Sequence, residues 1–216
     1  MTEEARVGVD EAGKGPVLGP MVAAAVRAPR GTLPDGVDDS KRLAPSRRED
    51  LAARLRADDA VEVGVAAVGV ERIDDPATDM NGLTVAAQAE AVAAVARPGD
   101  RVLADAGDVD ADRFGRRVAD AVETAVEVVA EHGADERYAS VAAASVVAKV
   151  ERDRRVAALA AEYGEVGSGY PSDPTTRAFL REYVRDHGTL PDCARASWRT
   201  CEDVLAAAEQ SALSEF

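Results

Sequence analysis

Cysteine, histidine, lysine and aromatic residues are all scarce in this chain of 216 residues. Its two cysteines, Cys193 and Cys201, are too few for a framework of disulfide bonds, so we expect free thiols in a reducing compartment. The only two histidines are His132 and His187. With so few thiol and imidazole groups, the sequence gives little support to a zinc site.

Long apolar runs are missing as well. No stretch approaches the roughly 20 apolar residues that are needed to span a bilayer. The first residues, Met-Thr-Glu-Glu-Ala-Arg, are acidic and lack the basic and apolar parts of a signal peptide. Together with the free thiols, these features predict a cytoplasmic protein. Its length of 216 residues is enough for one substantial core and a small appendage.

Positive charge is the most unusual shortage. The chain has 26 Lys and Arg against 40 Asp and Glu, which gives a formal net charge of −14, and its only lysines are Lys14, Lys41 and Lys149. Because a nucleic-acid enzyme normally has a basic surface, one interpretation is an ordinary acidic protein without such a partner. The alternative is a nucleic-acid enzyme with the acidic composition of proteins from extreme halophiles. In about 1 M salt the Debye length is roughly 3 Å, so the long-range repulsion between such a protein and DNA largely vanishes.

The most informative segment that is present covers residues 7–20, Val-Gly-Val-Asp-Glu-Ala-Gly-Lys-Gly-Pro-Val-Leu-Gly-Pro. Its apolar start predicts a buried strand, and the glycines predict where that strand stops. Asp10 and Glu11 lie near this end and could hold a hard divalent cation. Because strand side chains alternate between faces, both acids can serve one site only if the strand is ending there. The alternative is a strand followed by a polar turn, but the ordered string favours a site for a phosphate-containing substrate.

The string Asp-Glu-Ala-Gly-Lys-Gly-Pro resembles the N-terminal signature of type 2 ribonucleases H (ribonuclease HII), which usually has Arg where this chain has Lys14. Lysine keeps the charge but lacks the planar fork of arginine, so the effect on substrate binding stays open. Further segments resemble motifs of this family in the family's order, two of them in the form of its archaeal branch. They are residues 39–43, 102–105, 134–138, 142–150 and 167–174. All three lysines lie within these motifs, which favours the halophile interpretation.

The resemblance implies a site with two kinds of residue. Asp10, Glu11, Asp105 and Asp135 would be the catalytic residues and the ligands of Mg²⁺ or Mn²⁺. Four acids from distant parts of the chain would repel one another without cations, and two metals roughly 3.5–4 Å apart can assist phosphodiester hydrolysis. The substrate would be bound by Gly13, Lys14, Gly15, Ser40, Lys41, Ser145, Lys149 and Tyr170.

Other acids compete for these roles. Asp108, Asp110 and Asp112 follow Asp105 closely, and we interpret them as a solvated loop and a helix N-terminus, where acids complement the helix dipole. Asp153 is the rival of Asp135. It follows Ser145 by eight residues on one predicted helix, which places it roughly 12 Å further along. We therefore expect Asp135 to be the fourth ligand.

The hydrophobic pattern predicts an α/β fold. Strands are expected at 5–12, 20–27, 61–69, 101–105 and 125–130, and helices at 45–57, 81–96, 110–122, 140–162, 174–187 and 197–212. Two successive strands followed by alternation predict a mixed sheet, and the resemblance implies the ribonuclease H-like, five-stranded form flanked by helices. Gly and Pro near residue 165 predict a catalytic domain over 1–165 and a C-terminal loop and helical extension over 166–216.

The resemblance also implies the activity. The chain would be an endoribonuclease that hydrolyses the RNA strand of RNA–DNA hybrids and cleaves 5′ of ribonucleotides embedded in duplex DNA. A two-metal mechanism would leave 3′-hydroxyl and 5′-phosphate ends, and a sliding clamp is a candidate partner of a monomeric enzyme. Two alternatives remain. A 3′–5′ exonuclease would need motifs of its own around the acids, and a non-catalytic nucleic-acid-binding module would have lost some of the acids.

The charge of −14 generates a first prediction. Folding should improve toward molar KCl, because salt screens the repulsion among the acidic side chains. Circular dichroism and thermal unfolding measured from very low to molar salt check this. Full structure at very low salt, with no gain in unfolding temperature when salt is added, would contradict it.

Overall fold

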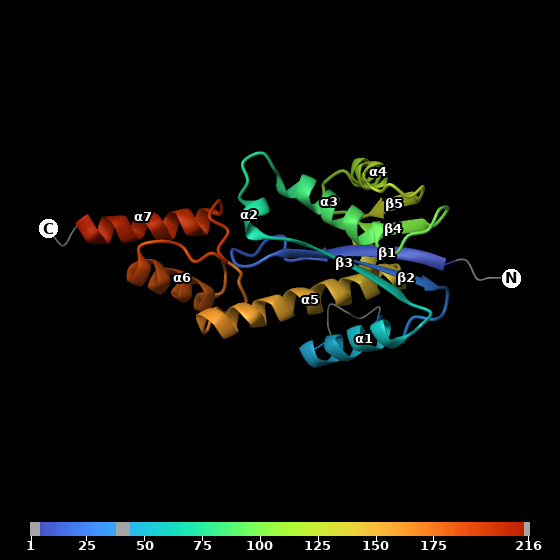
Figure 1. Ribbon diagram of the computed structural model, residues 1–216, viewed down its shortest axis with the longest axis horizontal. Helices are drawn as coiled ribbons and strands as arrows, with labels where there is room; N and C mark the ends of the chain where they lie inside the picture. The colour runs from blue at the N-terminus through green and yellow to red at the C-terminus, as the bar shows by residue number, and fades with distance from the viewer. Residues whose placement is uncertain (1–4, 38–43, 214–216) are drawn as a thin grey trace. The chain divides into compact units, whose positions relative to one another are not determined.

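The computed structural model describes residues 5–37 and 44–213, and the chain divides into two compact units (Figure 1). The first unit consists of residues 1–12, 21–67 and 80–152. The second consists of residues 13–20, 68–79 and 153–216. The motif at 39–43, with the predicted substrate contacts Ser40 and Lys41, lies outside the described residues.

A mixed five-stranded sheet forms the centre of the first unit, in the order β3-β2-β1-β4-β5. Its strands are β1 (Ala5–Ala12), β2 (Met21–Pro29), β3 (Glu62–Val68), β4 (Arg101–Asp105) and β5 (Glu127–Glu131). β1 pairs antiparallel with β2 and parallel with β4, which in turn pairs parallel with β5. The carboxyl ends of β1 and β4 therefore meet at one edge of the sheet, and the predicted mixed sheet is confirmed.

Helices cover both faces of this sheet (Figure 1). They are α1 (Pro45–Ala57), α3 (Met80–Ala93), α4 (Ala111–Ala121) and the part of α5 (Ala139–Tyr163) that ends at Arg152. α3 and α4 lie on one face, and α1 and α5 on the other.

Small residues bring α5 against the sheet. Ala24, Val26 and Ala28 of β2 share a buried cluster with the alanines of α5 and with Leu55 of α1. At Gly8 of β1 an added Cβ would lie only 2.1 Å from the carbonyl carbon of Ser140. Only glycine fits there, and this contact fixes the start of α5 beside the strand that carries Asp10 and Glu11.

The second unit has its own apolar core. It contains α2 (Val70–Ile73), the end of α5, α6 (Pro174–His187) and α7 (Arg199–Leu213). The core residues come from three stretches of sequence: Val17, Leu18, Val166, Phe179, Leu180, Cys193, Ala194 and Cys201. Both cysteines are free, as expected. Both are also buried, and burial raises the pKa of Cys193 to about 11 and that of Cys201 to about 12.

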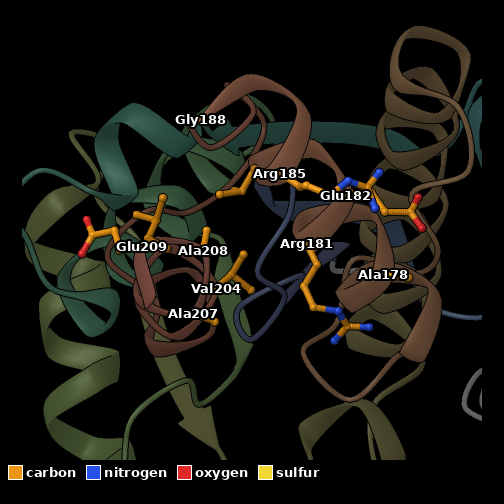
Figure 2. Close-up of a pocket in the computed structure, with 11 residues that line it drawn as sticks. Ala178, Arg181, Glu182, Arg185, Gly188, Val204, Ala207, Ala208 and Glu209 are labelled. Atoms are coloured by element: carbon orange, nitrogen blue, oxygen red, sulfur yellow. The ribbon is translucent and has the colours of Figure 1, made fainter. Parts of the chain in front are cut away.

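A groove of about 770 Å³ lies between α6 and α7 (Figure 2). Its lining consists of Ala178, Arg181, Glu182, Val184, Arg185, Gly188, Val204, Leu205, Ala207, Ala208 and Glu209. Two arginines are balanced by two glutamates, and none of the predicted site residues is among the lining. The groove therefore lacks the excess of positive charge that a phosphate-binding surface needs.

The predicted strands and long helices are present, each end within three residues of the expected position. The pattern did not predict α2 or the 3₁₀ turn η2 (Ala134–Glu136), each of which spans four residues or fewer. The division into domains at residue 165 stays a prediction. Among the described residues, no helix combines the length and apolar character that a membrane crossing requires.

Candidate functional site

Asp10 and Glu11 are consecutive residues of β1 and project to opposite faces of the sheet. Asp10 lies on the face of α5, where the hydroxyl of Ser145 hydrogen-bonds its carboxylate. Glu11 lies on the face of α3, where Nε2 of Gln88 donates a hydrogen bond of 2.7 Å to its Oε2. β1 ends at Ala12, directly after Glu11, so the two acids border the same end of the sheet from its two sides.

Asp105 is the last residue of β4 and lies beside Asp10. In the parallel pairing Val9 is opposite Ala104, so the next residue along each strand is an aspartate. Oδ1 of Asp105 accepts a hydrogen bond of 2.9 Å from the backbone N–H of Ala134, and its carbonyl oxygen accepts one of 3.0 Å from Nε2 of Gln88. These bonds hold the end of β4 from two sides.

The pKa of Asp10 reflects both its burial and the neighbouring carboxylates. Asp10 is only 6% exposed, and its pKa is raised well above the usual range, mainly because burial disfavours the charged form. Repulsion from Glu11 and Asp105 raises this pKa further, whereas the Ser145 hydrogen bond and the positive charge of Lys149 lower it. A cation at this end of the sheet would relieve the repulsion.

Asp135 lies in η2, in the same unit as the other three acids. Gly133, with a φ of 65°, turns the chain after β5, and the N–H of Ala134 then binds Asp105. Asp135 follows directly and is 4% exposed. Its rival Asp153 is exposed and belongs to the second unit. The hydrogen bond from Ala134 therefore places the residue before Asp135 beside Asp105, and Asp135 stays the predicted fourth ligand.

The donor set suits a hard cation. Asp10, Glu11, Asp105 and Asp135 offer only carboxylate oxygen, which is what Mg²⁺ and Mn²⁺ prefer. Within residues 5–37 and 44–213, no three Asp, Glu, His or Cys side chains are already arranged as a metal-binding group. The residues present fit the metal in chemistry and charge, and binding would have to draw their oxygens together.

Ser145 and Lys149 lie one turn apart on α5, next to Asp10. The Lys149 Nζ donates a hydrogen bond to the Ser145 Oγ, and Ser145 is fully buried. They are therefore more than a surface pair, because both also act on the charge of Asp10.

The glycine loop and the tyrosine loop lie together in the second unit. The backbone N–H groups of Val17 and Leu18 both donate to the carbonyl oxygen of Gly169, at 2.8 and 3.2 Å. Tyr170 follows and is 40% exposed. Gly15 is also exposed, and an added Cβ there would meet nothing within 4 Å. Two of the predicted substrate-binding segments are thus in contact within this unit.

The other acids after Asp105 have structural roles. Oδ1 of Asp110 accepts a hydrogen bond from the N–H of Arg113 and caps α4, and Asp112 lies in the first turn of that helix. Asp108 differs from the expected solvated side chain. It is 6% exposed, and a hydrogen bond of 2.6 Å from Nη2 of Arg113 is the main cause that lowers its pKa.

Two residues that contact the site segments were not predicted. Gln88 is fully buried and bridges Glu11 and Asp105 from α3, and Arg195 is fully buried in the second unit. The only signal for Gln88 is a single amide in a stretch that is otherwise rich in Ala and Val. Arg195 has no such signal in the sequence. Its hydrogen bonds go to backbone carbonyls, which every residue has, so no particular residue type marks its partners.

Comparisons with known proteins point in one direction. The family model described as Ribonuclease HII matches residues 7–201. The chain is 66% identical to Ribonuclease HII of Haloarcula marismortui, over 98% of this chain and 100% of that protein. It is 63% identical to Ribonuclease HII of Halobacterium salinarum, over 98% and 100% of the two chains.

Solved structures agree. The chain is similar to the ribonuclease H2 from Pyrococcus horikoshii OT3, with a TM-score of 0.88, 36% identity and coverage of 95% and 99% of the two chains. It is also similar to a chain of the PCNA:RNase HII complex from Archaeoglobus fulgidus, with a TM-score of 0.81, 39% identity and coverage of 90% and 95%.

The repulsion at Asp10 predicts a conflict between stability and metal binding. Asp10→Asn should raise the unfolding temperature of the metal-free protein, because the amide removes a charge that burial disfavours and that Glu11 and Asp105 also repel. A gain on the order of 1 kcal/mol would correspond to about 2–4 °C for a chain of this size. Added Mn²⁺ should stabilise the unsubstituted protein much more than the variant.

Thermal unfolding in molar KCl, with EDTA or with Mn²⁺, measures both effects. Asp59→Asn, which changes an exposed acid of the same unit, serves as the matched control. A variant that melts earlier without metal and still gains the full stabilisation by Mn²⁺ would refute this view of Asp10.

Proposed function

The chain belongs to the ribonuclease HII family of endonucleases, which act on RNA in RNA–DNA hybrids, and from this we propose how its residues carry out the reaction. We further propose that it cleaves 5′ of single ribonucleotides embedded in duplex DNA and leaves 3′-hydroxyl and 5′-phosphate ends. One observation supports the catalytic part most directly. Parallel pairing of β1 and β4 places Asp10 beside Asp105, and burial, with added repulsion from Glu11 and Asp105, raises the pKa of Asp10.

In this proposal Asp10, Glu11, Asp105 and Asp135 hold Mg²⁺ or Mn²⁺. Two such ions, when bound, activate the attacking water and stabilise the attacking and leaving oxygens of the phosphodiester. Gln88 orients Glu11 and fixes the end of β4 through its two hydrogen bonds. Ser145 and Lys149 stabilise the charged form of Asp10, which is the form that binds a cation.

Substrate recognition is assigned to the second unit together with α5. Gly13, Lys14 and Gly15 offer backbone groups to a ribose, and direct contact with a 2′-hydroxyl lets a protein tell RNA from DNA. The exposed ring of Tyr170 can stack on a nucleotide. Ser145 and Lys149 bind the backbone from α5, and Ser40 and Lys41 stay predictions from the sequence.

A sliding clamp is the proposed protein partner, and the cytoplasm the proposed compartment. Support for the clamp comes from the structural similarity to the RNase HII of the Archaeoglobus fulgidus complex with PCNA. Because the chain is 66% and 63% identical to proteins of the halophilic archaea Haloarcula marismortui and Halobacterium salinarum, we propose that the contact forms at high salt.

The metal ligands can be ranked by substitution. Asp10→Asn and Asp105→Asn should abolish cleavage of an RNA–DNA hybrid, since an amide binds a hard cation poorly. Asp135→Asn should lose about tenfold to a hundredfold, because water can replace a peripheral ligand. Asp153→Asn should remain close to the unsubstituted enzyme. Steady-state rates in Mg²⁺ and Mn²⁺ measure this order, and an inactive Asp153→Asn beside a normal Asp135→Asn would reverse our assignment.

Substrate choice tests the second part of the proposal. The enzyme should cut a duplex with one ribonucleotide on its 5′ side and leave the all-DNA duplex of the same sequence intact. Tyr170→Ala should reduce this cleavage more than Tyr170→Phe, because phenylalanine keeps a stacking energy of roughly 1–3 kcal/mol. Equal cleavage of the all-DNA duplex, or full activity of Tyr170→Ala, would remove Tyr170 from substrate recognition.

The clamp contact is tested without nucleic acid. Size-exclusion chromatography with light scattering in molar KCl should give the enzyme a monomer mass of 22.6 kDa. Addition of the sliding clamp of a halophilic archaeon should shift the enzyme to a complex. Separate elution at micromolar concentrations of both proteins would rule out a stable contact.

A further inference from the structure

The buried guanidinium of Arg195 binds the glycine loop of the second unit. Its Nη2 donates to the carbonyl oxygen of Gly13 at 2.6 Å, Nη1 to that of Lys14 at 3.0 Å, and Nε to that of Gly19 at 2.9 Å. Arg195 is 0% exposed. Desolvating a positive charge is costly, and here the hydrogen bonds that offset this cost go to both ends of a single loop.

These bonds fix the orientation of two peptide groups. A trans peptide is planar, so its N–H points away from its C=O. Because the carbonyls of Gly13 and Lys14 point at Arg195, the N–H groups of Lys14 and Gly15 point away from it. The positive φ of 85° at Gly13 allows this turn, and Gly15 is exposed with no atom near the position of a Cβ. The N–H of Gly15, at an exposed residue, thereby faces away from the arginine.

Neighbouring groups hold Arg195 in place. The ring of Trp198 lies 5.1 Å from its Cζ, and the backbone N–H of Arg195 donates to the carbonyl oxygen of Val17 at 2.8 Å. Asp74 accepts hydrogen bonds from the N–H groups of Ala196 and Ser197, at 2.7 and 3.0 Å. Segments that are far apart in sequence thus converge on one arginine.

We propose that Arg195 is a positioning residue that sets the glycine loop for recognition of a 2′-hydroxyl, with Asp74 supporting it. The inference rests on the proposed role of this loop in substrate binding. The role needs arginine, because the planar fork reaches three carbonyls at fixed angles, whereas a lysine ammonium is a point charge. Arg195→Lys keeps the charge and should still leave the loop poorly defined.

The first experiment measures binding in EDTA and molar KCl, where no cleavage occurs. Fluorescence anisotropy gives the Kd for a duplex with one ribonucleotide and for the all-DNA duplex of the same sequence. Arg195→Lys should lower the ratio of the two Kd values by about tenfold, which corresponds to about 1.4 kcal/mol. Asp74→Asn should lower it less. Arg199→Lys, the same substitution at an exposed arginine nearby, should leave the ratio unchanged.

A second readout does not depend on substrate. Hydrogen–deuterium exchange should accelerate in Arg195→Lys at the amides of Val17, Leu18 and Gly19, which are hydrogen-bonded in this loop, and not along α5. Unchanged exchange and an unchanged Kd ratio, even with a lower unfolding temperature, would overturn the proposal and leave Arg195 a stabilising residue only. A third outcome separates the two ideas. If exchange is faster in Arg195→Lys but the unsubstituted protein binds both duplexes equally well, Arg195 positions the loop, and the proposed recognition of RNA by this loop is refuted.

Discussion

The burial of the Asp10 carboxylate beside Glu11 and Asp105 is the constraint around which the first unit is arranged. Parallel pairing of β1 and β4 puts two of these acids on neighbouring strands, and burial of Asp10 makes its charge expensive. The surrounding residues are those that keep the cluster in place without neutralising it. Gln88 holds Glu11, the N–H of Ala134 holds Asp105, and Ser145 with Lys149 holds Asp10. We propose that a divalent cation, by relieving the repulsion, recovers the free energy that this arrangement costs.

Small residues make that arrangement possible. Gly8 allows α5 to contact β1, and the alanines of β2 and α5 allow a close approach without large side chains. The recognition that we propose for the second unit is built differently. There the backbone of the glycine loop would be the substrate-binding surface, and the buried Arg195 donates hydrogen bonds to three of its carbonyl oxygens. In this proposal the charged side chains serve the chemistry and backbone amides recognise the sugar, which suits a protein of net charge −14.

Sequence alone predicts the strands and their terminal acids well, because Asp10 and Asp105 each end an apolar run in a chain whose hydrophobic pattern is clear. It cannot predict Gln88 as a bridge, because the side chain that it binds lies 77 residues away. It also misses Arg195, whose acceptors are carbonyls that every residue has. Asp108 was expected in solvent because the sequence does not show that Arg113 would fold over it. The local hydrophobic pattern predicts helices and strands. It does not predict side-chain contacts between residues that are distant in sequence and meet only in the folded chain.

The central claim is that the acids at the ends of β1 and β4 form a divalent-metal site. Anomalous diffraction from crystals soaked in Mn²⁺ tests it most directly. The account predicts manganese peaks within coordination distance, about 2.0–2.6 Å for oxygen ligands, of Asp10, Glu11 and Asp105, and no such peak in Asp10→Asn crystals. Manganese bound only at other acids of this strongly acidic chain, with none at these three, would contradict it.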